Sequence, residues 1–320
     1  MGRIPIPLPG QNRQATPFDL AIGRGDQALR RGQYSEAMLQ FQQARTLNAT
    51  DARPSFYIGE TLIRQGQYAQ AEAHLRNAIR LNPRMAEAHA DLGTVLRELH
   101  RSAEAVAEFQ AALQLDPTLS EAHAGMAMSL EDAGQTDRAI AEYRRAVALA
   151  PTSPMPALNL GILLANTHPA AGTQARAEAF RMLQAAVRNA NNDRAVLANA
   201  GPALRAVGEH ALAAQVLERA RAAGTPTAAL LGELAQALWA SGNRPVALQR
   251  IAEAVALDAA NGGLHYVRGL MLADQGQLAE ATAEMRRVVQ AGGDAALVER
   301  ARQRLADLQR ASAQAAPRRH

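Results

Sequence analysis

The tripeptide Glu-Ala-His ends at His89 and again 34 residues later at His123. A histidine close to a carboxylate is the pairing that general bases and metal sites use, so these residues are the first candidates for chemistry. Their spacing argues against it. Residues two apart on a helix point roughly 200° away from each other, so Glu87 cannot orient His89. A zinc-binding helix would place two histidines at i and i+4, and the sequence has no such pair. We predict that these histidines, and His265, pack or form hydrogen bonds within a helix pair; contact between His89 and His123 is the alternative.

The composition removes several further classes of enzyme. The chain of 320 residues has no cysteine, which excludes thiol nucleophiles and zinc-thiolate sites. All of its basic residues are arginine, which excludes a P-loop and Schiff-base chemistry. The stretch from Gly23 to Ala28, GRGDQA, fits the dinucleotide-binding pattern, but that pattern needs a preceding strand, and we expect a helix here. We predict that the protein is not an enzyme and binds no cofactor or metal.

The strongest regularity is a repeat interval of 34 residues. Small, large and small residues recur in register in four copies, at Ala37, Ala71, Ala105 and Ala139, then Phe41, Leu75, Phe109 and Tyr143, then Ala44, Ala78, Ala112 and Ala146. A glycine precedes three of these copies, at Gly32, Gly66 and Gly134. Four weaker copies follow, marked by Ala179, Ala213, Ala247 and Ala281, after an insertion near residues 166–174. Fixed small residues let two antiparallel helices approach closely, and glycine suits the turn between them.

This pattern resembles the tetratricopeptide repeat, in which each 34-residue unit folds as two helices. The resemblance implies an all-α, right-handed solenoid of about eight helix-turn-helix repeats. We expect these at 18–51, 52–85, 86–119, 120–153, 154–193, 194–227, 228–261 and 262–295. A cap helix is expected at 296–311 and a disordered tail at 312–320. The proline-rich residues 1–17 are expected to be flexible, although docking in a groove of this chain or of a neighbour is the alternative.

The resemblance also implies where a partner would bind, because first helices in this family line a concave groove. The residues that fall at the corresponding positions are Phe56, Glu60, Arg64, Arg97, Glu131, Met155, Leu158, Asn159, Ile162, Asn199, Trp239, Tyr266 and Leu270. The N-terminal part of this groove is charged and the C-terminal part is mostly apolar, which suits an amphipathic or extended peptide. Trp239 and Tyr266 are candidate anchors, since large aromatic residues dominate many interfaces. The alternative is that Trp239 belongs to the core of its repeat.

We therefore predict a non-enzymatic scaffold or adaptor of bacterial type that binds a peptide or helical segment of a partner protein. The alternatives are a nucleic-acid-associated or regulatory protein that uses an arginine-rich C-terminal helix, and a component of an envelope or secretion assembly. Nucleic acid is not the expected partner, because charges are mixed along most of the chain. Self-association is left open. No membrane span and no secretory signal are evident, so we expect a cytoplasmic protein, or a periplasmic one if a signal peptide was removed.

Overall fold

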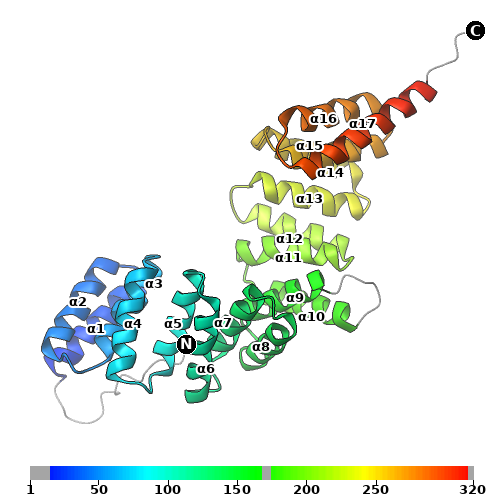
Figure 1. The fold of residues 1–320 in the computed structure, drawn as a ribbon. Helices are drawn as coiled ribbons and strands as arrows, with labels where there is room; N and C mark the ends of the chain where they lie inside the picture. Colours follow the sequence, from blue (N-terminus) through cyan, green and yellow to red (C-terminus); the bar gives the residue numbers. More distant parts are fainter. Residues whose placement is uncertain (1–14, 168–173, 316–320) are drawn as a thin grey trace, which may run out of the picture. The chain divides into compact units, whose positions relative to one another are not determined.

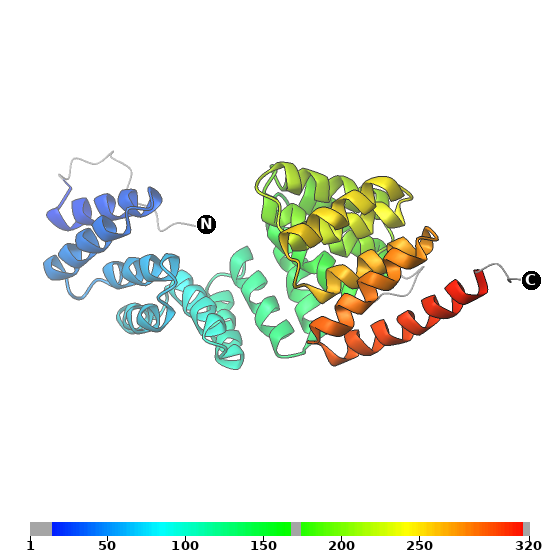
Figure 2. The same ribbon diagram turned by 90° about the horizontal axis from the view of Figure 1, so that it is seen from above.

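The computed structural model describes residues 15–167 and 174–315, and these residues form helices joined by turns, without strands (Figure 1). They divide into two compact units, an N-terminal unit up to Pro151 and a C-terminal unit from Thr152 onward. Each unit is a stack of antiparallel helix pairs, and the pairs can be followed in a second view (Figure 2). The described residues therefore have the all-α repeat architecture that the 34-residue interval predicts.

The N-terminal unit contains four helix pairs. Its helices are α1 (Pro17–Arg30), α2 (Tyr34–Leu47), α3 (Arg53–Arg64), α4 (Tyr68–Leu81), α5 (Ala86–Glu98), α6 (Ser102–Leu115), α7 (Ser120–Asp132) and α8 (Thr136–Leu149). Thr16 begins α1 as its N-cap, and its side chain accepts a hydrogen bond from the backbone N–H of Asp19.

The C-terminal unit contains four further pairs and one single helix. Its helices are α9 (Pro154–Thr167), α10 (Gln174–Asn189), α11 (Arg194–Ala206), α12 (His210–Ala222), α13 (Ala228–Ala240), α14 (Arg244–Leu257), α15 (Gly262–Asp274), α16 (Leu278–Ala291) and α17 (Ala295–Ala315). The insertion expected in the fifth repeat falls between α9 and α10, where residues 168–173 lie outside the described part of the chain. The cap helix α17 runs four residues past its predicted end at 311, because Ala-rich residues continue it until Pro317 approaches.

The recurring small and large residues meet inside each pair. A Cβ on Gly25 of α1 would collide with the Phe41 ring of α2, and a Cβ on Gly59 of α3 would collide with Leu75 of α4. Gly25, the second glycine of the GRGDQA stretch, is therefore part of a close helix–helix contact. Phe41 and Leu75 are fully buried by this approach. The dinucleotide-like pattern thus serves helix packing, as the repeat interval predicts.

In the pairs whose inner turn the structure describes, that turn contains a residue in the left-handed backbone conformation. Gly32 and Gly66 provide it with φ of 72°, a region that costs glycine nothing. In the third pair His100 occupies the same place with φ of 59°. A side chain in this conformation is strained, so this turn is the exception among the strong repeats.

First and second helices of the pairs have different neighbours. In the N-terminal unit successive first helices pack on one another, α1 on α3, α3 on α5 and α5 on α7. The second helices α2, α4 and α6 instead each pack on the first helices on either side, and α8 packs on α7. The solvent-facing side chains of α1, α3, α5 and α7 consequently form one continuous surface, which we call the inner face of the N-terminal unit. The second helices α2, α4, α6 and α8 form its outer face.

Candidate functional site

The repeated histidines are held in the same way in three pairs. The Nδ1 atoms of His89, His123 and His265 lie 2.7, 2.7 and 2.5 Å from the carboxylates of Glu108, Glu142 and Glu284, which come from the second helix of the same pair. The Nε2 atom of each ring faces a backbone carbonyl six residues earlier, and for His123 this is Pro117 at 3.2 Å. Each histidine thus joins the preceding loop, the first helix and the second helix. The prediction of hydrogen bonding within the helix pair is confirmed.

This arrangement leaves the ring nitrogens engaged. His123 and Glu142 are each about nine-tenths buried, and Arg145 also donates a hydrogen bond to Glu142 at 2.6 Å. A general base needs a free ring nitrogen aimed at a substrate, and here both nitrogens have protein acceptors. Across residues 15–167 and 174–311, no three histidine, aspartate or glutamate side chains converge as metal ligands would. The histidine–glutamate pairs therefore have the geometry of structural contacts between the two helices of a repeat.

The charged residues predicted for the groove lie on the inner face of the N-terminal unit. Arg64 pairs with Glu60 on α3 at 2.6 Å, and Arg97 of α5 pairs with Glu98. Arg97 also reaches Asp132 of α7, with 4.0 Å between its Nη1 and the carboxylate. Arg97 thus connects two successive repeats, which shows that this face is continuous from α5 to α7.

Two carboxyl groups on this face are unusual in their protonation. Burial raises the pKa of Asp91 to about 7, with Glu60 and Glu87 adding to the rise and Arg64 opposing it. Burial also raises the pKa of Glu131, although a hydrogen bond from the Tyr143 hydroxyl at 3.2 Å acts in the opposite direction. Because the pKa of Asp91 is about 7, the charge of this residue changes near neutral pH.

The aromatic candidates of the C-terminal unit are largely engaged in packing. Trp239 is partly buried against a core cluster that includes Leu231 and Ile251, and the Arg244 guanidinium lies 5.3 Å from its ring centre. Tyr266 and Leu270 pack against the cluster that joins α15 and α16 to α17. Most of the Trp239 side chain therefore packs in the core of its repeat, which is the alternative to a role as a binding anchor.

The remaining predicted groove residues divide by exposure. Phe56 and Leu158 are 8% and 1% exposed, so they pack in the core and do not offer a groove surface. Phe56 lies against Tyr57, the next residue of α3, with ring centres 5.3 Å apart. Asn159 and Ile162 are partly buried, and Met155 and Asn199 are exposed.

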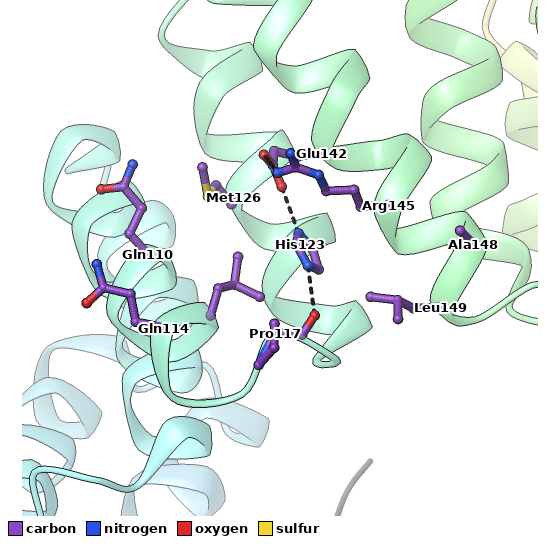
Figure 3. Close-up of a pocket in the computed structure, with 10 residues that line it drawn as sticks. Gln110, Gln114, Pro117, His123, Met126, Glu142, Arg145, Ala148 and Leu149 are labelled. Atoms are coloured by element: carbon purple, nitrogen blue, oxygen red, sulfur yellow. Dashed lines mark hydrogen bonds and ion pairs between the residues drawn. The ribbon is translucent and has the colours of Figure 1, made fainter.

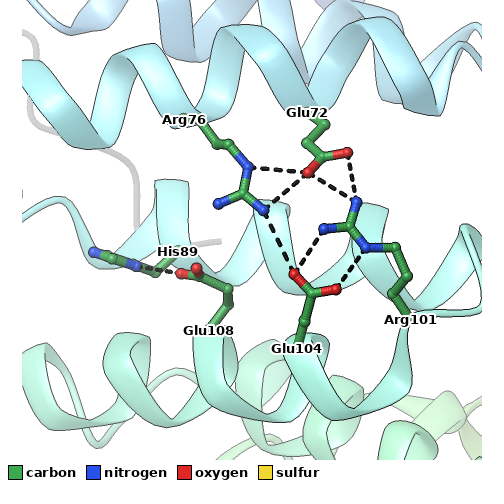
Figure 4. Close-up of polar contacts among 6 residues, drawn as sticks. All are labelled: Glu72, Arg76, His89, Arg101, Glu104 and Glu108. Atoms are coloured by element: carbon green, nitrogen blue, oxygen red, sulfur yellow. Dashed lines mark hydrogen bonds and ion pairs between the residues drawn. The ribbon is translucent and has the colours of Figure 1, made fainter.

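A network of four charged side chains joins α4 to α6 on the outer face (Figure 4). Arg101 contacts Glu72 at 2.9 Å and Glu104 at 2.6 Å, and Arg76 contacts the same two carboxylates at 2.9 and 3.8 Å. Burial alone would raise the pKa of Glu72, but the hydrogen bonds from both arginines bring it below its usual value. The network links α4 to the beginning of α6.

A cavity of about 620 Å³ lies between α6, the start of α7 and α8 (Figure 3). We call it the α6–α8 pocket. Its walls are mostly apolar and include Leu113, Pro117, Met126, Ala148 and Leu149. Gln110, Gln114 and Arg145 provide its polar groups, and the His123–Glu142 pair lies at its floor.

The α6–α8 pocket, Asp91 and the four-residue network were not predicted from the sequence. The glutamate partners of the histidines carry a detectable signal, because each follows its histidine at the same interval of nineteen residues.

The arginine-rich end of the chain forms α17, in which several arginines make ion pairs or contact an aromatic ring. Arg302 pairs with Glu299 at 3.5 Å and Arg310 with Asp307 at 2.6 Å, each one helical turn away. The Arg300 guanidinium lies 6.0 Å from the ring centre of Tyr266. These pairs reduce the net positive charge that α17 presents.

None of the described helices combines the length and the hydrophobicity that a membrane span requires.

The fold and the repeat contacts define a helical-repeat solenoid, a class whose members act as protein-interaction scaffolds. The sequence profiles described as "Tetratricopeptide repeat" match residues 56–120, 233–296 and 120–163, which together are more than half of the chain. The chain belongs to the tetratricopeptide repeat family. No curated protein matches it in sequence.

Solved structures share the fold at low sequence identity. A chain of the APC/C hetero-tetramer Cut9–Hcn1 matches with a TM-score of 0.60 and 16% identity, over 90% of this chain and 55% of that one. This chain thus spans about half the length of that relative. MamA from Desulfovibrio magneticus RS-1 matches with a TM-score of 0.47 and 19% identity, over 54% of this chain and 97% of that one. Another MamA structure matches with a TM-score of 0.45 and 18% identity, over 55% of this chain and 93% of that one.

Proposed function

We propose that this protein is a non-enzymatic scaffold that binds a peptide or helical segment of a partner protein on its first helices. Membership of the tetratricopeptide repeat family supports the scaffold role. The observation that carries the proposal is the contact of Arg97 on α5 with Asp132 on α7, because it makes the inner face a single charged surface across repeats. A partner lying on that face can contact several repeats at once.

The ion pairs on the inner face suit a partner with charges of both signs. Arg64 is exposed and partly neutralised by Glu60, so a partner carboxylate can compete for it without leaving a buried charge behind. Such exchanges contribute more to specificity and to the rate of association than to affinity. Apolar contacts would have to supply most of the binding free energy.

Affinity capture with the full chain tests this proposal. The groove variant carries Arg64→Glu and Arg97→Glu on the first helices, and the matched control carries Arg80→Glu and Arg138→Glu on the second helices. We expect proteins captured by the unaltered chain to be retained by the control and lost from the groove variant. Retention of the same proteins by the groove variant, with unchanged helicity, would overturn the proposal.

A further inference from the structure

The inner face of the N-terminal unit has an excess of carboxyl groups on two neighbouring first helices. The whole chain has a net charge of +4, so this excess is local. On α3 the charged residues are two arginines and one glutamate, and Arg64 pairs with Glu60. On α5 and α7 the only arginine is Arg97, which is already paired with Glu98 and Asp132. The acidic residues of these two helices are Glu87, Asp91, Glu98, Glu121, Glu131 and Asp132.

Asp91 is a recessed member of this set. Enough protein surrounds it for burial to be the main cause of its raised pKa, yet the residue stays partly exposed to solvent. A group with both properties lies at the floor of a concave surface, where a ligand can reach it. Within residues 15–167 and 174–315, no group forms a hydrogen bond with the Asp91 carboxyl. Its hydrogen-bonding capacity is therefore available to a ligand.

The charges around Asp91 come from two helices. α3 contributes Glu60 and Arg64, and α5 itself contributes Glu87. α4, α6 and α7, which also pack on α5, contribute no charged side chain of the described residues to this set. Both glutamates repel a negative charge on Asp91, and Arg64 offsets only part of this repulsion because it is paired with Glu60. A guanidinium or ammonium group placed between α3 and α5 would donate to Asp91 and relieve the repulsion.

We propose, building on the scaffold function above, that a basic segment of a partner protein lies over α5 and α7, with one arginine or lysine side chain beside Asp91. Glu131 and Asp132 lie on the same continuous face, since Arg97 connects α5 to α7 there, and they attract further basic residues of the segment. An acidic residue of the same partner can pair with Arg64 on α3. The partner thus carries both signs of charge, with its basic residues over α5 and α7.

Fluorescence anisotropy with the full chain and two synthetic peptides tests the charge of the partner. The probe is a labelled peptide of four Arg-Leu repeats with acetylated and amidated ends, and the comparison peptide has glutamate in place of each arginine. We expect the basic peptide to bind at least about tenfold more tightly than the acidic one. Equal binding, or a preference for the acidic peptide, would overturn the proposal.

A matched pair of variants locates the binding site. The site variant carries Glu87→Gln and Asp91→Asn, and the control carries Glu36→Gln and Asp137→Asn at exposed positions of α2 and α8. Both variants lose two carboxyl groups, so general attraction to the chain falls to a similar extent in each. We expect the affinity for the basic peptide to fall about tenfold in the site variant and less than about twofold in the control. Equal losses in the two variants would contradict a site on the inner face.

The pH dependence of binding reports on Asp91 itself. Arginine stays protonated at all the pH values used, so the peptide does not titrate. A bound cation favours the ionised form of Asp91, whose pKa is about 7 in the free protein. Binding of the basic peptide should therefore strengthen by about five- to tenfold from pH 6 to pH 8. We expect Asp91→Asn alone to remove this increase, and an increase of the same size in Asp91→Asn would overturn the placement of the cation beside Asp91.

These outcomes are distinct from a failure of the scaffold function. If the unaltered chain binds neither peptide while its captured proteins are still lost from the variant with Arg64→Glu and Arg97→Glu, the scaffold function stands and the basic segment is wrong. Retention of the captured proteins by that variant would instead overturn the scaffold function.

Discussion

His123 and Glu142 are nineteen residues apart in the chain, and their Nδ1 and Oε2 atoms lie 2.7 Å apart in the interior of the fourth helix pair. The same contact recurs between His89 and Glu108, and between His265 and Glu284. Because each contact joins the two helices of one pair, the histidines determine how firmly the pair holds together. We expect these histidines to stabilise the packing of the two helices in three repeats.

We expect His123→Ala to lower the free energy of unfolding by about 2–3 kcal/mol. The change removes the His123 ring from the buried Glu142 carboxylate, and a buried acceptor that loses a hydrogen-bond partner is costly even though Arg145 still donates to this carboxylate. Urea unfolding followed by circular dichroism measures the loss. The control is Arg138→Ala, at an exposed position one turn before Glu142 on α8, which should change stability by less than about 0.5 kcal/mol.

A double-mutant cycle separates the pair from its surroundings. If His123→Ala and Glu142→Ala interact by about 1 kcal/mol or more, the contact itself stabilises the pair. If the losses of stability from the two substitutions simply add, the His123–Glu142 contact does not stabilise the helix pair, and the effect of each substitution comes from packing alone.

Much of this architecture is present in the sequence because helix packing needs small residues at fixed places. Ala37 and Phe41 recur at 34-residue intervals since each pair must solve the same packing problem, so the interval predicts the pairs. The interval of nineteen between His123 and Glu142 is equally regular, yet its meaning depends on which faces of two helices meet.

The candidate site is less predictable for a physical reason. Repeat positions indicate which side of a helix faces inward, but burial depends on the side chains of neighbouring repeats. The repeat positions place Phe56 and Leu158 in the groove, yet both are buried. The α6–α8 pocket likewise depends on how the side chains of α6, α7 and α8 pack, which the repeat positions do not indicate.

The protonation of Asp91 leads to a prediction about pH. Its pKa of about 7 in the folded protein exceeds the usual value of 3.8 expected in the unfolded chain. The folded state therefore binds this proton more tightly, so stability decreases as the pH rises from about 4 to about 7 and then levels off. We expect Asp91→Asn to be more stable than the unaltered protein above pH 7, by on the order of 2 kcal/mol, with the difference shrinking towards pH 4.

Thermal unfolding of both proteins between pH 4 and 8 measures this difference, and the contributions of other titrating groups cancel in the comparison. Asp137→Asn, an exposed aspartate on α8, is the control and should not show the same trend with pH. A constant difference between Asp91→Asn and the unaltered protein at all pH values would contradict the assignment.

The turn at His100 leads to a stabilising substitution. His100 adopts φ of 59° where Gly32 and Gly66 stand in other pairs, and this conformation is strained for any residue with a Cβ. We expect His100→Gly to raise the free energy of unfolding by about 0.5–1 kcal/mol, after allowing for the greater freedom of glycine in the unfolded chain. Differential scanning calorimetry measures the change. The reverse substitution, Gly66→His, should lower stability by a similar amount, and a stabilising Gly66→His would argue against strain as the cause.

The packing of Trp239 leads to a prediction that separates stability from binding. The ring lies against Leu231 and Ile251 and beneath Arg244, so Trp239→Ala removes core contacts. We expect a loss of about 2–3 kcal/mol in the C-terminal unit, measured by thermal unfolding, and a smaller loss for Trp239→Phe, which keeps an aromatic ring in place. If Trp239→Ala leaves stability unchanged while it weakens capture of a partner, the ring is a binding anchor. If stability falls and Trp239→Phe retains both the fold and the partner, its main role is to pack the repeat.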